Sequence, residues 1–252
     1  MKVSAETNNL KHTFVNFRAG RSGEFILSLL MLMDNPNRQN ITVSDFGSCH
    51  TNRHREKQIL VGGIHCEGED VDTTLNEFEL DDQHPIYKAH VHDDKGQLLQ
   101  KFCKHFSDCT VINILSDDAS VDQITRNLWF KVYVQERSTY GADTLVRDMK
   151  RAGLEPKRNP FRISRADFDI LYADLKQDYK YLVKDQLIIN DIPNLHNINF
   201  DSLMNDKVGV IAKLCGLTQK ASNTRVNEFY NEYLSKQPTE QDMLDFRNNL
   251  DE

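Results

Sequence analysis

The chain has 252 residues, of which 39% are hydrophobic and 27% are charged, and its formal net charge at pH 7 is −7. A chain of this length can bury a sizeable core, so it forms one large domain or two small ones. The acidic balance argues against non-specific binding to nucleic acid or to anionic membranes, because counterion release requires clustered lysine and arginine. We therefore expect neither nucleic acid nor a membrane as a partner, and composition leaves the oligomeric state open.

The N-terminus and the cysteines indicate the compartment. Residues 1–7 are polar and contain no signal-peptide core, and no apolar run approaches the ~20 residues that span a bilayer. The five cysteines are scattered without a CxxC pair, and their odd number prevents complete internal pairing. Reduced, mostly structural thiols and a cytoplasmic location are therefore expected.

The first third of the chain alternates between strand and helix patterns. Residues 13–17 are predicted to form a short strand and 19–23 a turn. Residues 25–33 are predicted to form a buried helix, because this run is nearly all apolar and has no glycine or proline. Residues 41–44 are a second candidate strand. From 48 to 82 the pattern is weak, which indicates an irregular insertion with one helix, a candidate lid.

Two clear strands follow, at residues 86–91 and 110–115, and the second is the most strongly apolar segment of its kind in the chain. A helix is predicted after each strand. Apolar residues recur at helical spacing from 98 to 106 after the first. Ser120 and Gln123 form a candidate capping box for the helix after the second.

The C-terminal part is predicted to be mainly helical. Residues 137–162 are loop-rich and form a second irregular insertion. A long amphipathic helix then begins at a cap made by Ser164 and Asp167. A last short strand is expected at 197–200. The final amphipathic helix precedes Pro238, and the acidic tail after this proline is predicted to be loosely held.

The order of these elements determines the expected fold class. Strands that alternate with helices imply a parallel sheet that is covered on both faces. We therefore predict a three-layer α/β/α fold with a central parallel sheet, formed by a single domain over residues 1–252. The irregular insertions near 48–82 and 137–162 interrupt this domain, and its C-terminus is helical.

The turn Gly20-Arg21-Ser22-Gly23 joins the first predicted strand to the first predicted helix. Glycines allow backbone N–H groups to approach an anion closely, and the N-terminus of a helix adds roughly half a positive charge. Arg21 can donate paired hydrogen bonds to phosphate oxygens, and Ser22 can donate another. The turn is therefore predicted to bind a phosphate-like anion. The alternative is a plain strand–helix turn with a surface arginine.

This turn is not a full P-loop. The pattern GxxxxGK[ST] is absent, since neither Lys-Ser nor Lys-Thr follows Gly23. The hydroxyl that would hold a magnesium ion is therefore missing, which weighs against an ATPase or a nucleotide kinase. No metal ion is expected at the turn.

Four separated patches, in the order found here, resemble the sulfotransferase family. The segment 17–25 is similar to that family's shortened P-loop, which holds the 5′-phosphosulfate of 3′-phosphoadenosine 5′-phosphosulfate. Tyr87-Lys88-Ala89-His90 stands where members often carry Lys-Thr-His, whose histidine serves as general base. The strand at 110–115 is similar to the family's next strand. The segments 198–203 and 214–217 resemble the family's C-terminal motifs.

The resemblance implies a P-loop NTPase-like α/β fold. It also implies transfer of a sulfuryl group from 3′-phosphoadenosine 5′-phosphosulfate to a hydroxyl of a carbohydrate or small molecule. His90 would act as the general base, and Lys88 would supply a cation beside it. The implied donor-binding residues are those of the turn and one threonine after the strand at 110–115: Gly20, Arg21, Ser22, Gly23 and Thr125.

Acidic residues depart from the family's pattern at two places. Glu24 replaces the hydroxyl residue after the loop glycine, where a carboxylate repels a phosphosulfate unless it turns away or is paired. Asp117 and Asp118 stand where an arginine is expected. These residues favour a second hypothesis, a non-catalytic binding or structural protein on the same fold. A third is a divergent kinase-like phosphotransferase, which magnesium dependence would distinguish.

His90 permits two other interpretations. It could be a strand-end histidine bonded to the backbone. It could also bind a metal with His92, because residues that alternate by two face the same side of a strand, and Asp93 or Asp94 could add oxygen ligands. A neutral imidazole can take a proton from an acceptor hydroxyl near neutral pH, so the general base is the interpretation that we favour.

Overall fold

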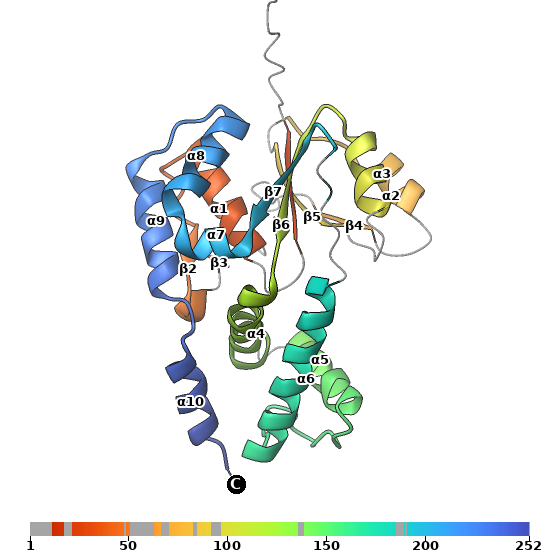
Figure 1. Ribbon diagram of the computed structural model, residues 1–252, viewed down its shortest axis with the longest axis vertical. Helices are drawn as coiled ribbons and strands as arrows, with labels where there is room; N and C mark the ends of the chain where they lie inside the picture. Colours follow the sequence, from red (N-terminus) through yellow and green to blue (C-terminus); the bar gives the residue numbers. More distant parts are fainter. Residues whose placement is uncertain are drawn as a thin grey trace, which may run out of the picture.

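A five-stranded parallel sheet forms the centre of the computed structural model (Figure 1). Its order is β4-β5-β1-β6-β7, and all neighbouring strands run parallel. The strands are β1 (Thr13–Asn16), β4 (Gly63–Cys66), β5 (Ile86–Val91), β6 (Thr110–Leu115) and β7 (Leu195–Asn199). The first strand therefore lies in the middle of the sheet, between β5 and β6.

The structure describes residues 12–17, 22–47, 49–50, 63–66, 71–82, 85–91, 97–135, 139–184, 189 and 191–251. Within these segments, a small second sheet consists of β2 (Thr42–Val43) and β3 (Cys49–His50), which pair antiparallel. No helix in the same segments combines the length and the apolar character that crossing a membrane requires.

Helices cover both faces of the central sheet (Figure 1). One side holds α1 (Gly23–Asp34), α7 (Phe200–Asn205), α8 (Lys207–Thr218) and α9 (Thr224–Ser235). The other side holds α2 (Val71–Glu77) and α3 (Gln97–His105). The layers are therefore helix, sheet and helix, which confirms the predicted three-layer α/β/α fold. With β1 at the centre and α1 directly after it, the fold is of the P-loop type.

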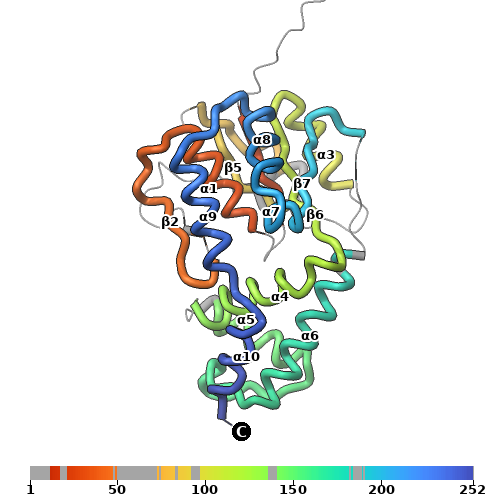
Figure 2. The backbone as a smooth tube through the Cα atoms, turned by 60° about the vertical axis from the view of Figure 1, so that its left-hand side comes forward, coloured from red at the N-terminus to blue at the C-terminus, as the bar shows by residue number. Residues whose placement is uncertain are grey.

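A helical lobe lies beyond the carboxyl ends of the strands (Figure 2). β6 leads into it through the short helix η2 (Asp118–Ser120). The buried Trp129 ring lies edge-on to Phe168 and to Tyr133, at centroid distances of 4.8 and 4.6 Å, so the lobe has an aromatic core. The lobe consists of α4 (Val121–Trp129), the π-helical turn η3 (Phe130–Gln135), α5 (Thr139–Arg151), α6 (Arg165–Lys184) and α10 (Glu240–Asn248).

Side chains that alternate along the strands point into two separate hydrophobic cores, one on each face of the sheet. On β1, Phe14 packs toward α2 and α3, and its ring lies 4.9 Å from Tyr87 and 5.0 Å from Phe102 between centroids. Val15 points to the opposite face and joins the core that includes α1. Successive side chains on a strand point to opposite faces, so a strand that is buried on both faces requires a nearly continuous apolar run.

Most of the predicted elements are present. The strands predicted at 13–17, 86–91 and 110–115 match β1, β5 and β6, and the apolar run after the turn forms α1. The predicted cap of the long helix α6 is present as well. The Asp167 amide donates to Ser164 Oγ at 3.2 Å, and the Ser164 amide donates to Asp167 Oδ2 at 3.1 Å. These bonds satisfy amides that the start of a helix leaves unpaired.

Two predictions of irregular structure are wrong. The stretch 137–162 contains α5, whose Leu145 and Met149 are each 1% exposed and lie one turn apart in the core. The apolar residues of α5 recur at helical spacing, so the sequence carried a signal for this helix that was missed. The stretch 48–82 contains the one helix that was expected, α2, but also β4, which pairs with β5.

The acidic tail after Pro238 is helical instead of loosely held. α10 begins at a capping box in which the Thr239 amide donates to Asp242 Oδ2 at 2.7 Å and the Asp242 amide donates to Thr239 Oγ1 at 3.1 Å. Met243 is buried, and the Phe246 ring lies near the Trp129 ring. Packing against the lobe therefore holds this segment in place.

The helix after β6 starts differently from the prediction. Ser120 makes no side-chain cap for α4, so the capping box with Gln123 is wrong. Instead, Asp117 Oδ1 accepts from the Ser120 amide at 2.9 Å and also from the Ser120 hydroxyl. The Gln123 side chain donates to the Pro238 carbonyl at 3.1 Å. Asp117 is therefore the capping residue at this helix start.

A row of asparagines crosses the sheet near the carboxyl ends of its strands. Asn16, Asn113 and Asn197 are register partners on β1, β6 and β7. Asn16 Nδ2 donates to Asn113 Oδ1 at 2.9 Å, and Asn113 Nδ2 donates to Asn197 Oδ1 at 3.0 Å. The Asn16 side chain also bonds the amide and the carbonyl of Val91 on β5. The amides thus satisfy one another and tie four neighbouring strands together.

Replacing Asn113 with alanine removes the centre of this row. We expect Asn113→Ala to lower the free energy of unfolding by about 2–4 kcal/mol, because two largely buried amides each lose a partner. Urea unfolding measures the change. Asn205→Ala is the control, since its exposed amide donates only to Asp201 one turn away, and a change below about 0.5 kcal/mol is expected. Equal losses in the two variants would contradict the structural role of the row.

Candidate anion-binding site

The predicted site residues lie at the carboxyl ends of β1 and β5 and at the start of α1. α1 begins at Gly23, directly after Ser22, on the carboxyl side of the central strand. Of the four turn residues, Ser22 and Gly23 belong to the described segments, whereas Gly20 and Arg21 lie outside them. In open α/β sheets, ligands bind outside the carboxyl ends of the strands, so this is the expected place for a site.

Ser22 precedes α1 with a left-handed backbone, with φ of 60° and ψ of 27°. Its carbonyl accepts from the amides of Phe25 at 3.0 Å and Ile26 at 3.4 Å, which begins the helix. Its hydroxyl oxygen accepts a hydrogen bond from the hydroxyl of Tyr233 on α9. Since the first amides of a helix carry a partial positive charge, this end of α1 can bind an anion.

Gly23 has a packing role beside its predicted role in anion binding. An ideal Cβ at Gly23 would lie 1.9 Å from Cδ1 of the Phe17 ring, which is far inside van der Waals contact. Phe17 is buried at the end of β1, and its amide donates to the Ala89 carbonyl at 3.3 Å. The ring of Phe17 thus occupies the space that a side chain at the helix start would need.

Lys88 and Glu24 form an ion pair. Lys88 Nζ lies 2.7 Å from Glu24 Oε1, with the Glu24 side chain 10% exposed and the Lys88 side chain 31% exposed. Lys88 Nζ also lies 5.4 Å from the centroid of the Phe17 ring, as in a cation–π contact. The carboxylate that the sequence places in the first turn of α1 is therefore paired, which removes much of its repulsion toward a bound anion.

His90 is held by the main chain of Phe17, the residue directly after β1. Its Nδ1 lies 2.7 Å from the carbonyl oxygen of Phe17, and its ring lies edge-on to the Phe17 ring at a centroid distance of 4.7 Å. A carbonyl oxygen can only accept, so Nδ1 carries the proton. In the neutral ring, Nε2 then carries the lone pair that a general base needs. This is the backbone bond of a strand-end histidine, and it also selects the tautomer of a base.

The structure therefore brings three of the predicted residues to one aromatic ring. Gly23, Lys88 and His90 all contact Phe17. Lys88 and His90 stand two residues apart on β5, so they lie on the same face of the sheet, toward α1. An imidazole, a cation and the positive end of a helix are thus adjacent, a set of groups that suits transfer of a charged group to a hydroxyl.

Thr125 lies elsewhere. It is 0% exposed inside α4, and its Oγ1 donates to the Val121 carbonyl at 2.7 Å. Among the described residues, no hydrogen bond joins Thr125 to Ser22, Lys88 or His90. Its hydroxyl is committed to its own helix, and its role in donor binding stays a prediction.

The metal interpretation of His90 depends on residues outside the described segments. His92, Asp93 and Asp94 lie outside the residues that the structure describes. Within residues that are described, no group of three or more histidine, cysteine, aspartate or glutamate side chains could hold a metal ion.

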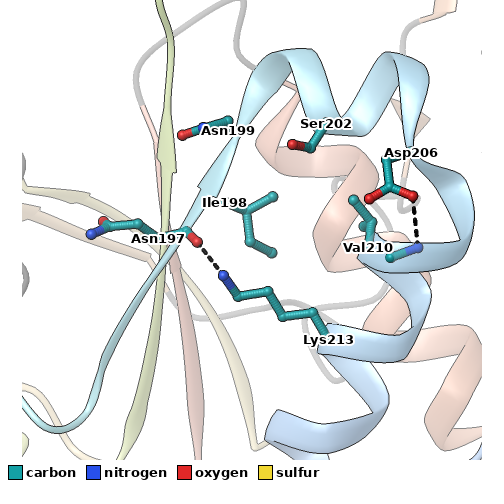
Figure 3. Close-up of a pocket in the computed structure, with 8 residues that line it drawn as sticks. Asn197, Ile198, Asn199, Ser202, Asp206, Val210 and Lys213 are labelled. Carbon is teal, nitrogen blue, oxygen red and sulfur yellow. Dashed lines mark hydrogen bonds between the residues drawn. The ribbon is translucent and has the colours of Figure 1, made fainter.

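A separate pocket of about 210 Å³ opens between β7 and the helices α7 and α8 (Figure 3). Its charged residues are engaged with backbone groups. Lys213 Nζ donates to the Asn197 carbonyl at 2.5 Å, and Asp206 Oδ1 accepts from the Gly209 amide at 2.9 Å and so caps α8. β1 and β6 stand between β7 and β5, so this pocket is distinct from the site around His90.

Two site residues were missed by sequence reasoning. Phe17 was read only as the end of a strand and the first residue of the P-loop-like segment 17–25, and Tyr233 only as part of an amphipathic helix. Their positions carried some signal, since Phe17 is the last apolar residue before the turn and Tyr233 is a polar-tipped residue on an apolar face. Neither signal identifies the contacts of the side chain. Lys88 and His90, which meet Phe17, and Ser22, which meets Tyr233, lie far from them in the sequence.

No family model matches the sequence, and no curated protein matches it in a sequence comparison. Among the solved structures that match the chain are two sulfotransferases. One is the sulfotransferase domain from the curacin biosynthetic pathway, with 13% identity, coverage of 89% of this chain and 82% of that chain, and a TM-score of 0.33. The other is a sulfotransferase from Alicyclobacillus acidocaldarius, with 14% identity, coverage of 90% and 94%, and a TM-score of 0.37. Sequence identities and TM-scores this low assign no activity to this chain.

Substitution of Gly23 tests the contact with Phe17. We expect Gly23→Ala to lower the free energy of unfolding by about 1–3 kcal/mol, because the added methyl group overpacks against a buried ring. Gly216→Ala is the matched control. Gly216 also lies within a helix, but an added Cβ would meet nothing within 4 Å. There alanine should stabilise by up to about 1 kcal/mol through helix propensity. Stabilisation in both variants, measured by urea unfolding, would contradict the packing role of Gly23.

Proposed function

We propose that the chain is a sulfotransferase-like enzyme that transfers a sulfuryl group from 3′-phosphoadenosine 5′-phosphosulfate to a hydroxyl of a carbohydrate or small molecule. The observation that supports this most is the bond from His90 Nδ1 to the Phe17 carbonyl, which leaves the lone pair of the neutral ring on Nε2. This base stands on the strand next to the one that leads into α1, whose N-terminus suits the donor's phosphosulfate.

Donor binding is assigned to the turn and the helix start. Ser22, Gly23 and the amides of the first turn of α1 would bind the phosphosulfate together with Gly20 and Arg21. The helix N-terminus favours an anion, and arginine forms paired hydrogen bonds with phosphate oxygens. The donor is a substrate here, and no metal ion is required.

The chemical step is a single in-line displacement. His90 Nε2 takes the proton from the acceptor hydroxyl while that oxygen forms a bond to sulfur. The bond between sulfur and the bridging oxygen of the donor breaks, and adenosine 3′,5′-bisphosphate leaves with the electron pair. Lys88 would stabilise the negative charge that develops on the departing phosphate. For this, its ammonium must turn from Glu24 toward the donor or contact both.

The first test is binding of the product nucleotide. We expect adenosine 3′,5′-bisphosphate to raise the Tm of the purified protein. Arg21→Ala should weaken this binding by about tenfold or more, because charge-assisted hydrogen bonds contribute about 1.5–3 kcal/mol. Arg38→Ala is the control, since Arg38 lies beyond the opposite end of α1 and pairs with Asp34. A wild-type protein that does not bind the nucleotide would exclude this donor.

The second test separates chemistry from binding. His90→Asn keeps a side chain that can donate to the Phe17 carbonyl but cannot accept the acceptor's proton. We expect transfer of labelled sulfuryl to a panel of carbohydrate and small-molecule hydroxyls to fall by about 10²–10⁴-fold, with nucleotide affinity within about twofold of the wild type. A chelator should leave transfer unchanged, whereas a kinase-like phosphotransferase would stop without magnesium. Full activity in His90→Asn would refute the role of the base.

The ion pair of Lys88 with Glu24 favours a second candidate, a non-catalytic binding or structural protein on the same fold. In that case the pair is a permanent structural element and the turn is architectural. The chain would then bind no adenosine 3′,5′-bisphosphate, and Arg21→Ala would leave its biological activity intact. The nucleotide-binding test therefore distinguishes the two candidates.

A further inference from the structure

We propose that Tyr233 is a positioning residue of the anion site, and that it holds Ser22 so that the serine hydroxyl can donate to a phosphate oxygen. This proposal rests on the function proposed above. It gives a role to a residue near the C-terminus that no motif indicated.

The first reason is the conformation of Ser22. Its left-handed backbone, with φ of 60°, is uncommon for a residue other than glycine and costs about 1–2 kcal/mol. Such conformations persist only where the surrounding structure holds them, and they concentrate at ligand sites. The hydrogen bond from the Tyr233 hydroxyl to Ser22 Oγ is a contact that can hold this residue.

The second reason is the direction of that bond. Because Tyr233 donates, the Ser22 oxygen is the acceptor, and the serine's own proton is directed elsewhere. A hydroxyl that accepts a hydrogen bond becomes a stronger donor, because chains of hydrogen bonds polarise one another. Tyr233 therefore orients and strengthens the donor that the proposed phosphosulfate would meet.

The third reason is the rigidity of Tyr233 itself. Its ring is buried and stacks on the Phe25 ring in α1 at a centroid distance of 3.7 Å and an interplanar angle of 10°. Burial raises the pKa of the Tyr233 hydroxyl well above its ordinary value, so the group stays protonated and remains a donor. The donor atom therefore has little freedom relative to the start of α1.

The chain also supplies a matched control. Tyr230 lies one turn earlier on α9, is fully buried, and packs edge-on against the same Phe25 ring at a centroid distance of 4.8 Å. Its hydroxyl donates to the Leu203 carbonyl at 2.8 Å instead of to the turn. Removing either hydroxyl deletes one buried hydrogen bond and keeps the ring.

The experiment compares Tyr233→Phe with Tyr230→Phe. Both variants should lower the Tm by a similar amount, about 2–4 °C. In calorimetric titration with adenosine 3′,5′-bisphosphate, Tyr233→Phe should lose about tenfold in affinity, whereas Tyr230→Phe should stay within about twofold of the wild type. Equal losses of affinity in the two variants would overturn the proposal, because they would reflect stability alone.

A double-mutant cycle tests whether Tyr233 acts through Ser22. In a Ser22→Ala background, Tyr233→Phe should change nucleotide affinity by less than about twofold, since the group that it positions is gone. A further tenfold loss in that background would overturn the proposal.

Hydrogen exchange gives a readout that needs no ligand. The amides of Phe25 and Ile26, which donate to the Ser22 carbonyl, should exchange faster in Tyr233→Phe than in Tyr230→Phe. Unchanged exchange would overturn the positioning role even if the nucleotide binds. A wild-type chain that does not bind the nucleotide, but shows the faster exchange, would instead refute the donor and keep Tyr233 as the residue that holds Ser22.

Discussion

The ring of Phe17 is the contact on which the rest of the site depends. It fills the space that a side chain at Gly23 would need, and it faces both the Lys88 ammonium and the His90 ring. The carbonyl of the same residue determines which nitrogen of His90 carries the proton. Because interiors are close-packed, a large ring at the end of the central strand restricts the positions of the α1 start and the His90 ring. The start of α1, the Lys88 ammonium and the His90 imidazole are thus gathered around one residue.

Charge is the second constraint on the site. Glu24 stands in the first turn of α1, where the helix end favours a negative group, and Lys88 on β5 compensates it. A nearly buried carboxylate is tolerated when it is paired, whereas an unpaired one is costly. The site therefore contains an internal anion and its counterion side by side. Under the proposed function, attraction for the phosphosulfate has to come from the turn, the helix end and any rearrangement of Lys88.

The C-terminal helices connect the site to the rest of the fold. α9 packs along α1 through Phe25, Tyr230 and Tyr233, and α10 then continues into the lobe beyond the strand ends (Figure 2). One continuous stretch of chain thereby contacts the start of the first helix and the aromatic core around Trp129. The lobe and the start of α1 are held relative to the sheet by the same pair of helices, so the geometry of the site depends on packing across the whole fold.

The sequence by itself determined the parallel α/β architecture, because strands buried on both faces need continuous apolar runs such as 110–115. It also determined that Lys88 and His90 lie on one face of their strand, because successive side chains point to opposite faces. Sequence reasoning missed α5, although its apolar residues recur at helical spacing, and it missed β4, which has only four residues. Only the tertiary structure decided that Glu24 meets Lys88 and that Tyr233 meets Ser22, across 64 and 211 residues of chain. The local pattern of apolar and polar residues indicates whether a side chain is buried. Which buried or polar groups meet is decided by the order of the strands and by the helix that packs beside them.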